Sequence, residues 1–368
     1  MDMVFVNKNT VLGILCFTLF TLFGTCFSRA FTANFVFGDS LVEVGNNNYI
    51  PSLSRANYVP NGIDFGRPTG RFTNGRTIVD IIGQELGFKT FTPPYMAPST
   101  TGRVILRGIN YASGSAGILN NTGKIFIARI NMDAQIDNFA NTRQDIITMI
   151  GLHSAIDLLR TSIFSITIGS NDFINNYFTP VLSDSGHRLI PPELFVGSMI
   201  SRYRLQLTRL YNLGARRIVV VNVGPIGCIP YQRDSNPSLG NNCANSPNLM
   251  AQLFNSQLRG LLTELGSRFQ DGNFLYADAF HIVQDIVQNH ASYGFENADS
   301  ACCHIAGRYG GLFPCGPPSS VCVDRSKYVF WDSFHPSEAA NSIIAGRLLN
   351  GDAVDIWPIN IRELERLN

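Results

Sequence analysis

The sequence predicts a single α/β domain built on a parallel β-sheet that is covered by helices on both faces. Short apolar runs rich in Val, Ile and Phe end abruptly in small or polar residues, as buried parallel strands do. Amphipathic segments with apolar residues at helical spacing lie between these runs. The chain has no internal repeat and no low-complexity linker, so nothing in it marks a second domain.

The expected strands are residues 34–37, followed by Gly-Asp-Ser; 108–112, followed by Ser-Gly-Ser; 163–168, followed by Gly-Ser-Asn-Asp; 217–223, followed by Gly-Pro; and 274–277. The expected helices, in which apolar residues recur every three or four positions, are residues 77–86, 132–139, 194–213, 248–269 and 337–349. Parallel strands of an open sheet bind ligands at their carboxyl ends. The loops at Ser40, Gly114 and Asn171 should therefore face one crevice.

The composition limits the class of protein. Hydrophobic residues make up 45% of the 368 and charged residues 15%, which provides a large core and argues against a disordered, coiled-coil or collagen-like chain. Lys and Arg number 28 and Asp and Glu 27, so the formal net charge is +1. A chain without a basic excess lacks the electrostatic signature of a nucleic-acid-binding protein, so no nucleic-acid partner is expected.

Residues 1–30 have the pattern of a secretory signal peptide. Lys8 is followed by the apolar stretch 11–23, and Ser28 and Ala30 occupy the −3 and −1 positions of a cleavage site. The stretch is shorter than the about 20 apolar residues of a membrane span, although an uncleaved anchor is the alternative. We predict a signal peptide over 1–30 and a secreted domain over 31–368. Asn120 begins an Asn-Asn-Thr sequon, which in a secreted protein is either a glycan site or left unoccupied.

The cysteine pattern agrees with secretion. Cys16 and Cys26 belong to the predicted signal peptide, and the other six lie in loop-rich stretches of the C-terminal half. These six are candidates for disulfide bonds: Cys228, Cys243, Cys302, Cys303, Cys315 and Cys322. We expect Cys228 to pair with Cys243, because they flank one loop, and Cys302 and Cys303 each to pair with Cys315 or Cys322. The alternative, a zinc site formed by the last four with His304, has poor ligand spacing for zinc.

Ser40 and His335 are candidates for nucleophilic catalysis. Ser40 follows the first expected strand, where Gly38 permits a tight turn and the strand end fixes the direction of the hydroxyl. In the sequence DSFHP, Pro336 places His335 before the following helix rather than inside it. Asp332 would accept the Nδ1 proton of the imidazole and leave Nε2 to deprotonate a serine. The alternative is that Asp332 caps the helix beside an incidental histidine. The remaining histidines are expected at the surface or at helix caps.

Gly114 and Asn171 are candidates for the donors that stabilise an oxyanion. Acyl transfer places negative charge on the former carbonyl oxygen, and donors that already point at this oxygen lower the barrier. A glycine lets its backbone N–H approach a ligand closely, and an asparagine amide adds a second donor. Each residue alone is also a common turn former, which is the alternative for both.

Four sequence blocks occur in order along the chain: FVFGDSLVEVGNNNY (35–49), GINYASGSAGI (108–118), TIGSNDF (167–173) and FWDSFHPSEAAN (330–341). Supporting stretches are FGRPTGRFTNGRTIVD (65–80), NVGPIGCIP (222–230) and ACCHIAGRYGG (301–311). Together they resemble the plant-type GDSL esterase/lipases of the SGNH hydrolase superfamily over nearly the whole mature chain. The sequence departs from that pattern at Glu43, where an aspartate is expected, and after the paired cysteines.

The resemblance implies a single-domain, three-layer α/β/α fold with a central parallel sheet, similar to flavodoxin and distinct from the ordinary α/β-hydrolase fold. It maps the nucleophile to Ser40, the general base to His335 and the residue that orients this base to Asp332. It maps the oxyanion hole to Gly114 and Asn171, which we expect to act with the N–H of Ser40. The chain contains no G-x-S-x-G motif, so Ser115 in SGSAG is not expected to be a nucleophile.

These expectations converge on a secreted serine esterase or lipase that hydrolyses carboxylic esters through an acyl-enzyme. We expect a small-molecule or lipid ester as its partner, no cofactor and no metal, a monomer, and a place in the cell wall or apoplast. An acyltransferase or a polysaccharide deacetylase would use the same site. A secreted binding protein on a retired hydrolase scaffold is the alternative from another class, which the complete set of site residues disfavours.

Overall fold

The computed structural model describes residues 31–178, 190–240 and 242–367. The predicted signal peptide, with Cys16 and Cys26, lies outside the described residues. Within the described part of the chain, no helix combines the length and the apolar character that crossing a membrane requires.

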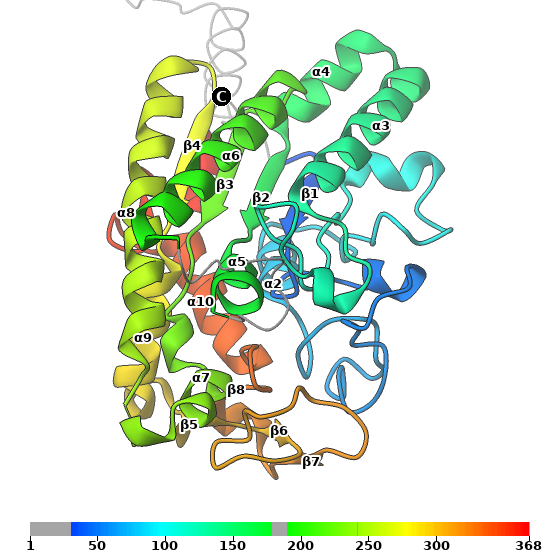
Figure 1. The fold of residues 1–368 in the computed structure, drawn as a ribbon. Helices are drawn as coiled ribbons and strands as arrows, with labels where there is room; N and C mark the ends of the chain where they lie inside the picture. The colour runs from blue at the N-terminus through cyan, green and yellow to red at the C-terminus, as the bar shows by residue number, and fades with distance from the viewer. Residues whose placement is uncertain (1–30, 179–189, 241, 368) are drawn as a thin grey trace, which may run out of the picture.

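A five-stranded sheet in the order β1-β2-β3-β4-β9 forms the centre of the fold (Figure 1). Its strands are β1 (Asn34–Gly38), β2 (Ile163–Thr167), β3 (Arg217–Val221), β4 (Asn273–Ala277) and β9 (Ile356–Trp357). The first four are parallel, as the sequence predicts; every residue of β1 and β3 is buried, and so are all but one residue of β2 and of β4. The short edge strand β9 pairs antiparallel with β4 and was not predicted.

Helices cover the sheet in two layers, which confirms the three-layer α/β/α architecture. The helices are α2 (Ile78–Glu85), α3 (Met132–Ile150), α4 (Leu152–Thr161), α5 (Ser170–Asp172), α6 (Pro192–Asn212), α7 (Pro230–Ser235), α8 (Asn245–Arg268), α9 (Ala279–Gln288), α10 (Glu338–Asn350) and α11 (Ile361–Arg366). In one layer α3 packs on α6 and α6 on α8; in the other α2 and α9 both pack on α10. Short 3-10 helices lie at Asn46–Tyr49, Gly102–Arg107, Lys124–Phe126, Ile226–Cys228, Pro237–Leu239, His290–Tyr293 and Arg325–Lys327. A π-helical turn lies at Phe173–Tyr177.

The sequence predicts a strand at residues 108–112, but these residues do not form a regular strand in the structure. The segment runs beside β1 and forms only isolated bridges, with Ile109 O accepting from Val36 N at 3.0 Å and Tyr111 N donating to Val36 O at 2.7 Å. The Asn110 side chain explains the irregularity, because its amide donates to Val42 O and its oxygen accepts from Ala112 N. Its path nevertheless brings the next loop to the carboxyl end of β1.

The predicted helix at 132–139 is too short, because α3 continues to Ile150. Mainly polar residues follow Phe139, but Thr142 and Ile146 are buried on one face of the helix, and the helix continues through them. Helices α4 and α9 were not predicted, whereas the ends of α2, α6, α8 and α10 lie within a few residues of the expected ones.

An aromatic cluster anchors the strand that leads to Ser40. The Phe35 ring lies 5.0 Å from Phe164 on β2 and 5.4 Å from Phe139 on α3, and Phe37 stacks on Tyr111 at 5.0 Å. All five side chains are buried. Buried aromatic pairs contribute both buried apolar area and a preferred arrangement of the rings. These pairs therefore fix β1 against the neighbouring strand β2 and against helix α3.

Two small sheets lie at one end of the molecule, where Figure 1 shows β5 (Asn297–Ala301) near β8 (Tyr328–Phe330) and β6 (Cys303–His304) near β7 (Ser320–Val321). All six candidate cysteines form disulfides: Cys228–Cys243, Cys302–Cys322 and Cys303–Cys315. The first pair matches the prediction, and the structure decides the other two. These bonds occupy the sulfur atoms that the alternative zinc site would need. Trp331, directly before Asp332, packs against the last two disulfides.

Candidate active site

Ser40 lies in the turn after β1, and the last residue of this strand, Gly38, has to be a glycine. Gly38 has φ +156°, and a Cβ there would lie 2.3 Å from Thr167 O on the neighbouring strand. Gln135 of α3 holds the same residue from the other side, donating to Gly38 O at 2.8 Å and accepting from its N–H at 2.9 Å. The Asp39 carboxylate accepts from Leu41 N at 3.0 Å. The hydroxyl of Ser40 is therefore carried on a turn fixed by the sheet and by α3.

His335 lies between Ser40 and Asp332, as the sequence predicts. Its Nε2 is 2.8 Å from Ser40 Oγ, and its Nδ1 is 2.8 Å from Asp332 Oδ1, although Ser40 and His335 are 295 residues apart in the chain. The same Asp332 oxygen accepts the backbone N–H of His335 at 2.9 Å, which fixes the carboxylate. The cap of α10 is Ser337 rather than Asp332, so the alternative role of Asp332 as a helix cap is wrong. Both Asp332 and His335 are buried.

Asn171 lies at the start of α5, after the end of β2, and its side chain lines the same cavity as Ser40. Its Nδ2 donates to Ala116 O at 3.0 Å, and its Oδ1 accepts from Asn175 at 2.6 Å. An amide NH₂ carries two protons, so the bond to Ala116 uses one and leaves the second for a ligand. The neighbouring Asp172 accepts from Ile118 N at 2.9 Å and ties this turn to the loop after residue 112.

Gly114 is placed differently from the other candidates. Its N–H donates to the carboxylate of Glu43, and the residue is not among those that line the cavity with Ser40. Glu43 also accepts from Asn47 N at 2.6 Å and is fully buried. The residue of this loop that lines the cavity is Ser115, which holds φ +63°. The role of Gly114 as an oxyanion donor stays a prediction, and it requires its N–H to leave Glu43.

Burial raises the pKa of three carboxyl groups around the site. The pKa of Asp39 rises to about 7, although the N–H of Leu41 and the nearby His335 lower it. The pKa of Glu43 rises to about 8 against its two backbone hydrogen bonds. The pKa of Asp172 rises to about 6, because desolvation outweighs three hydrogen bonds to its oxygens. The site therefore carries less negative charge at neutral pH than the sequence alone suggests.

A cavity of about 190 Å³ opens at Ser40, Asn171 and His335. More than a dozen polar residues border it, but most of its surface comes from apolar side chains of loops, α2, α9 and α10, among them Leu41, Phe72, Ile174, Ile226, Val283, Ile286, Phe334 and Ile344. Ligand sites of enzymes typically combine such an apolar wall with a few convergent polar groups. No group of three or more His, Cys, Asp and Glu side chains suited to a metal ion occurs in the residues described.

The arrangement provides a hydroxyl, a base hydrogen-bonded to it and a carboxylate that orients the base, at the edge of an apolar cavity. The family model described as GDSL-like lipase/acylhydrolase matches residues 35–348, which contain all of these groups. The chain belongs to the GDSL-like lipase/acylhydrolase family.

Relatives of this GDSL-like chain cover almost its whole length. A GDSL esterase/lipase of Arabidopsis thaliana is 61% identical over 365 residues, which are 99% of this chain and 98% of the relative. A second GDSL esterase/lipase of Arabidopsis thaliana is 48% identical over 374 residues, which are 98% of this chain and 100% of the relative. A third is 51% identical over 337 residues, with coverages of 90% and 87%. The family resemblance of the four sequence blocks is thereby confirmed.

Sequence reasoning missed three residues that hold the site of this GDSL-like hydrolase. Gln135 fixes the turn before Ser40, Glu43 binds the Gly114 loop, and Asp172 joins that loop to Asn171. The signal for Glu43 and Asp172 was present, because both lie inside the matched blocks. Nothing in the sequence around Gln135 marks it. The glycan candidate Asn120 is exposed, and its occupancy stays a prediction.

Proposed function

We propose that the chain is a secreted serine carboxylic ester hydrolase. Ser40 Oγ attacks the ester carbonyl carbon while its proton passes to His335 Nε2, and Asp332 stabilises the imidazolium through Nδ1. His335 then returns the proton to the alkoxide oxygen of the leaving alcohol, and the acyl group stays on Ser40. Water, deprotonated by His335, then attacks the acyl carbon, and the bond to Ser40 Oγ breaks as His335 returns the proton to this oxygen, which releases the carboxylic acid and restores Ser40. The observation that carries the proposal is the continuous Ser40–His335–Asp332 hydrogen-bond chain, with two distances of 2.8 Å.

The oxyanion that forms in each attack needs fixed donors. The backbone N–H of Ser40 and the second amide proton of Asn171 supply two, and the predicted third is the N–H of Gly114. Loss of one such donor typically lowers turnover by about 10²–10³-fold. The Gly114 N–H donates to Glu43 and has to leave that carboxyl group before it can donate to the oxyanion.

The lining of the cavity favours an ester that carries a hydrocarbon group. Burial of each methylene group contributes about 0.8 kcal/mol, so an apolar wall selects alkyl chains over hydrated sugar hydroxyls. We therefore favour esters with an alkyl chain over acetylated polysaccharides as substrates. The relatives are named esterase/lipases, which agrees with this choice.

Secretion and domain limits belong to the same proposal. We infer that residues 1–30 direct export and that residues 31–368 form the one hydrolase domain. Three disulfides support an oxidising compartment, because such bonds persist outside the reducing cytosol.

The test uses the purified mature chain and nitrophenyl esters. Ser40→Ala and His335→Ala should each abolish the release of nitrophenol above background, and Ser40→Ala should abolish covalent labelling by a serine-directed fluorophosphonate. Ser115→Ala is the matched control, since it removes a hydroxyl from the same cavity and should retain labelling. Labelling that persists in Ser40→Ala and disappears in Ser115→Ala would transfer the role of nucleophile to Ser115. Unchanged ester hydrolysis in His335→Ala would refute the assigned base.

A further inference from the structure

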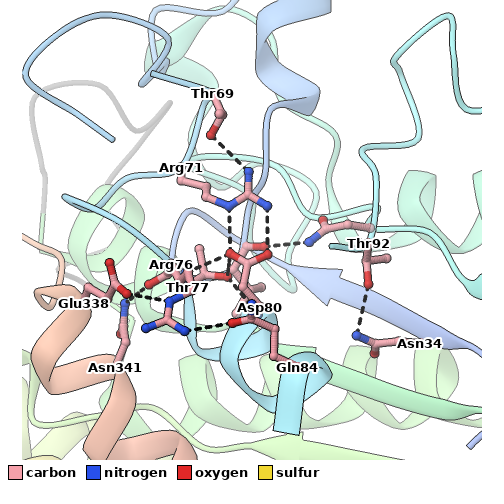
Figure 2. Close-up of polar contacts among 12 residues, drawn as sticks. Asn34, Thr69, Arg71, Arg76, Thr77, Asp80, Gln84, Thr92, Glu338 and Asn341 are labelled. Carbon is pink, nitrogen blue, oxygen red and sulfur yellow. Dashed lines mark hydrogen bonds and ion pairs between the residues drawn. The ribbon is translucent and has the colours of Figure 1, made fainter. Parts of the chain in front are cut away.

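The block FGRPTGRFTNGRTIVD (65–80) contributes Phe72 and Ile78 to the wall of the cavity but no reacting group, yet it contains a dense set of hydrogen bonds and ion pairs. Arg71 forms a bidentate ion pair with Asp80, with Nε–Oδ2 2.7 Å and Nη2–Oδ1 2.8 Å (Figure 2). Both side chains are buried, and Asp80 also forms a capping box with Thr77 at the start of α2. A buried, fully hydrogen-bonded pair of this kind fixes the backbone on both sides of it.

Residues 61–77, which we name the clamp segment, contact the loop that carries Asp332 and His335 at several points. Thr73 Oγ1 donates to Pro336 O at 3.1 Å, and Asn74 Oδ1 accepts from Glu338 N at 2.9 Å. On the other flank of the loop, Asn61 Oδ1 accepts from Trp331 Nε1 at 2.9 Å. The clamp segment thus holds the chain both before Asp332 and after His335.

Ion pairs strengthen both attachments. Arg76 Nε lies 2.5 Å from Glu338 Oε1, and Arg76 O accepts from Asn341 at 3.0 Å, as Figure 2 shows beside the Arg71–Asp80 pair. Asp64 binds Arg325, just before β8, through two contacts of 2.6 Å. Asn74 donates to Asp64 at 2.8 Å, so the two attachments are connected to each other.

The clamp segment also contacts the imidazole itself. The Phe72 ring lies 5.0 Å from the His335 ring with an interplanar angle of 32°. The His335 loop runs from the end of β8 at Phe330 to the start of α10 at Glu338, so it is in neither a strand nor a helix. Hydrogen bonds within the loop, such as Trp331 N to His335 O at 2.8 Å, define its shape, and contacts from outside the loop place it relative to Ser40.

We propose that the clamp segment positions His335 for proton transfer from Ser40, and that Thr73 and Arg76 are positioning residues of the reaction. This inference rests on the proposed role of His335 as general base. A base that shifts by about 1 Å from its productive place can lose about 10²-fold in rate, whereas Thr73 and Arg76 themselves do not line the cavity that binds the ester. A defect in the clamp should therefore lower kcat and leave KM nearly unchanged.

The first experiment compares two substitutions at Thr73. Thr73→Val keeps the shape and removes the donor to Pro336, and Thr73→Ser keeps the donor. We expect Thr73→Val to lower kcat for a nitrophenyl ester by about tenfold or more at unchanged KM, to slow fluorophosphonate labelling of Ser40 by a similar factor, and Thr73→Ser to restore both. Thr142→Val is the control, because Thr142 is equally buried and hydrogen-bonded but lies in α3.

A second pair of variants tests the ion pairs at two partly exposed acidic residues of matched exposure. Glu338→Ala removes the partner of Arg76, and Asp133→Ala removes the partner of Arg202. The exposed fractions are 37% and 20% for the first pair and 39% and 22% for the second, and both acids lie in the first turn of a helix. We expect only Glu338→Ala to lower kcat, by about threefold or more, with a similar loss of thermal stability in both variants.

The outcomes separate this inference from the proposed function. If His335→Ala abolishes hydrolysis but Thr73→Val and Glu338→Ala keep the kcat of their controls, the clamp segment is structural only and the inference is wrong. If His335→Ala retains hydrolysis, the proposed function fails first. If Thr73→Val does not fold, the comparison of Glu338→Ala with Asp133→Ala decides the question alone.

Discussion

Replacing Glu43 by glutamine should change how the stability of the fold depends on pH. Glu43 is fully buried, and its two oxygens accept the N–H groups of Asn47 and Gly114. Burial raises the pKa of this carboxyl from 4.5 to about 8 in the folded chain. Between these two pH values the folded chain keeps the proton, whereas the unfolded chain has already released it.

The size of the effect follows from proton linkage. Unfolding in this window releases a proton from Glu43, so a rise in pH favours the unfolded state by about 1.4 kcal/mol for each pH unit. The stabilisation is fully present below about pH 4.5 and is lost as the pH rises through about 8. Between pH 5 and pH 8 the wild-type chain should lose about 4 kcal/mol through this group. Glutamine does not titrate, and it leaves one N–H without an acceptor at a cost of about 1–3 kcal/mol at any pH.

The assay is guanidinium unfolding of wild type and Glu43→Gln at pH 5 and pH 8, followed by circular dichroism with the disulfides intact. The variant should be less stable than wild type by about 1–3 kcal/mol at pH 5 and more stable than wild type at pH 8, because the difference changes by about 4 kcal/mol, as an order of magnitude. Both proteins keep Asp172, so its contribution cancels, whereas the charge of Asp39 also raises the pKa of Glu43 and is a smaller part of the same effect. Exposed Glu85→Gln is the control and should show no such change. A deficit that is equal at both pH values would refute a protonated Glu43.

Three further changes test the site and its surroundings. Asp332→Asn should lower kcat by about 10⁴-fold at unchanged Tm, because asparagine favours the wrong imidazole tautomer; a smaller loss in ester hydrolysis would argue against the orienting role. Val283→Phe should narrow the inner cavity and reduce kcat/KM for an octanoyl ester but not for an acetyl ester, by about 0.8 kcal/mol per excluded methylene; equal effects on both would place the alkyl chain elsewhere. Cys303→Ser with Cys315→Ser opens a loop of 12 residues and should cost about 3 kcal/mol in thermal unfolding, whereas an unchanged Tm would contradict this.

Local pattern was enough to find most of the sheet and the candidate residues Ser40 and Asn171 that line the cavity. Strands β1 to β4 are short apolar runs that are almost wholly buried, so their burial can be recognised residue by residue. Ser40 and Asn171 could be assigned because each directly follows such a run. The strand prediction for residues 108–112 was wrong because it relied on the same apolar pattern. The hydrogen bonds of the Asn110 side chain interrupt the pairing of this segment with β1, and the apolar pattern does not reveal them.

Contacts between distant residues were beyond such patterns. The sequence did not distinguish Cys302–Cys322 from Cys302–Cys315, because adjacent cysteines have the same local surroundings. It marked Gly114 as a donor but not Glu43 as the group that would accept from it. In both cases the partner depends on how loops pack in space and not on the spacing of residues along the chain.

The sequence by itself determined the fold class, the family and the residues that can carry ester hydrolysis, because periodicity and short motifs record local burial and local turns. Only the tertiary structure decided that His335 reaches Ser40 across 295 residues, that Asp332 faces Nδ1, and that the clamp segment holds their loop from both sides. These distances arise from the packing of β1, α2, α10 and the small sheets against one another. A hydrogen bond of 2.8 Å tolerates only small errors in that packing, and no local pattern encodes it.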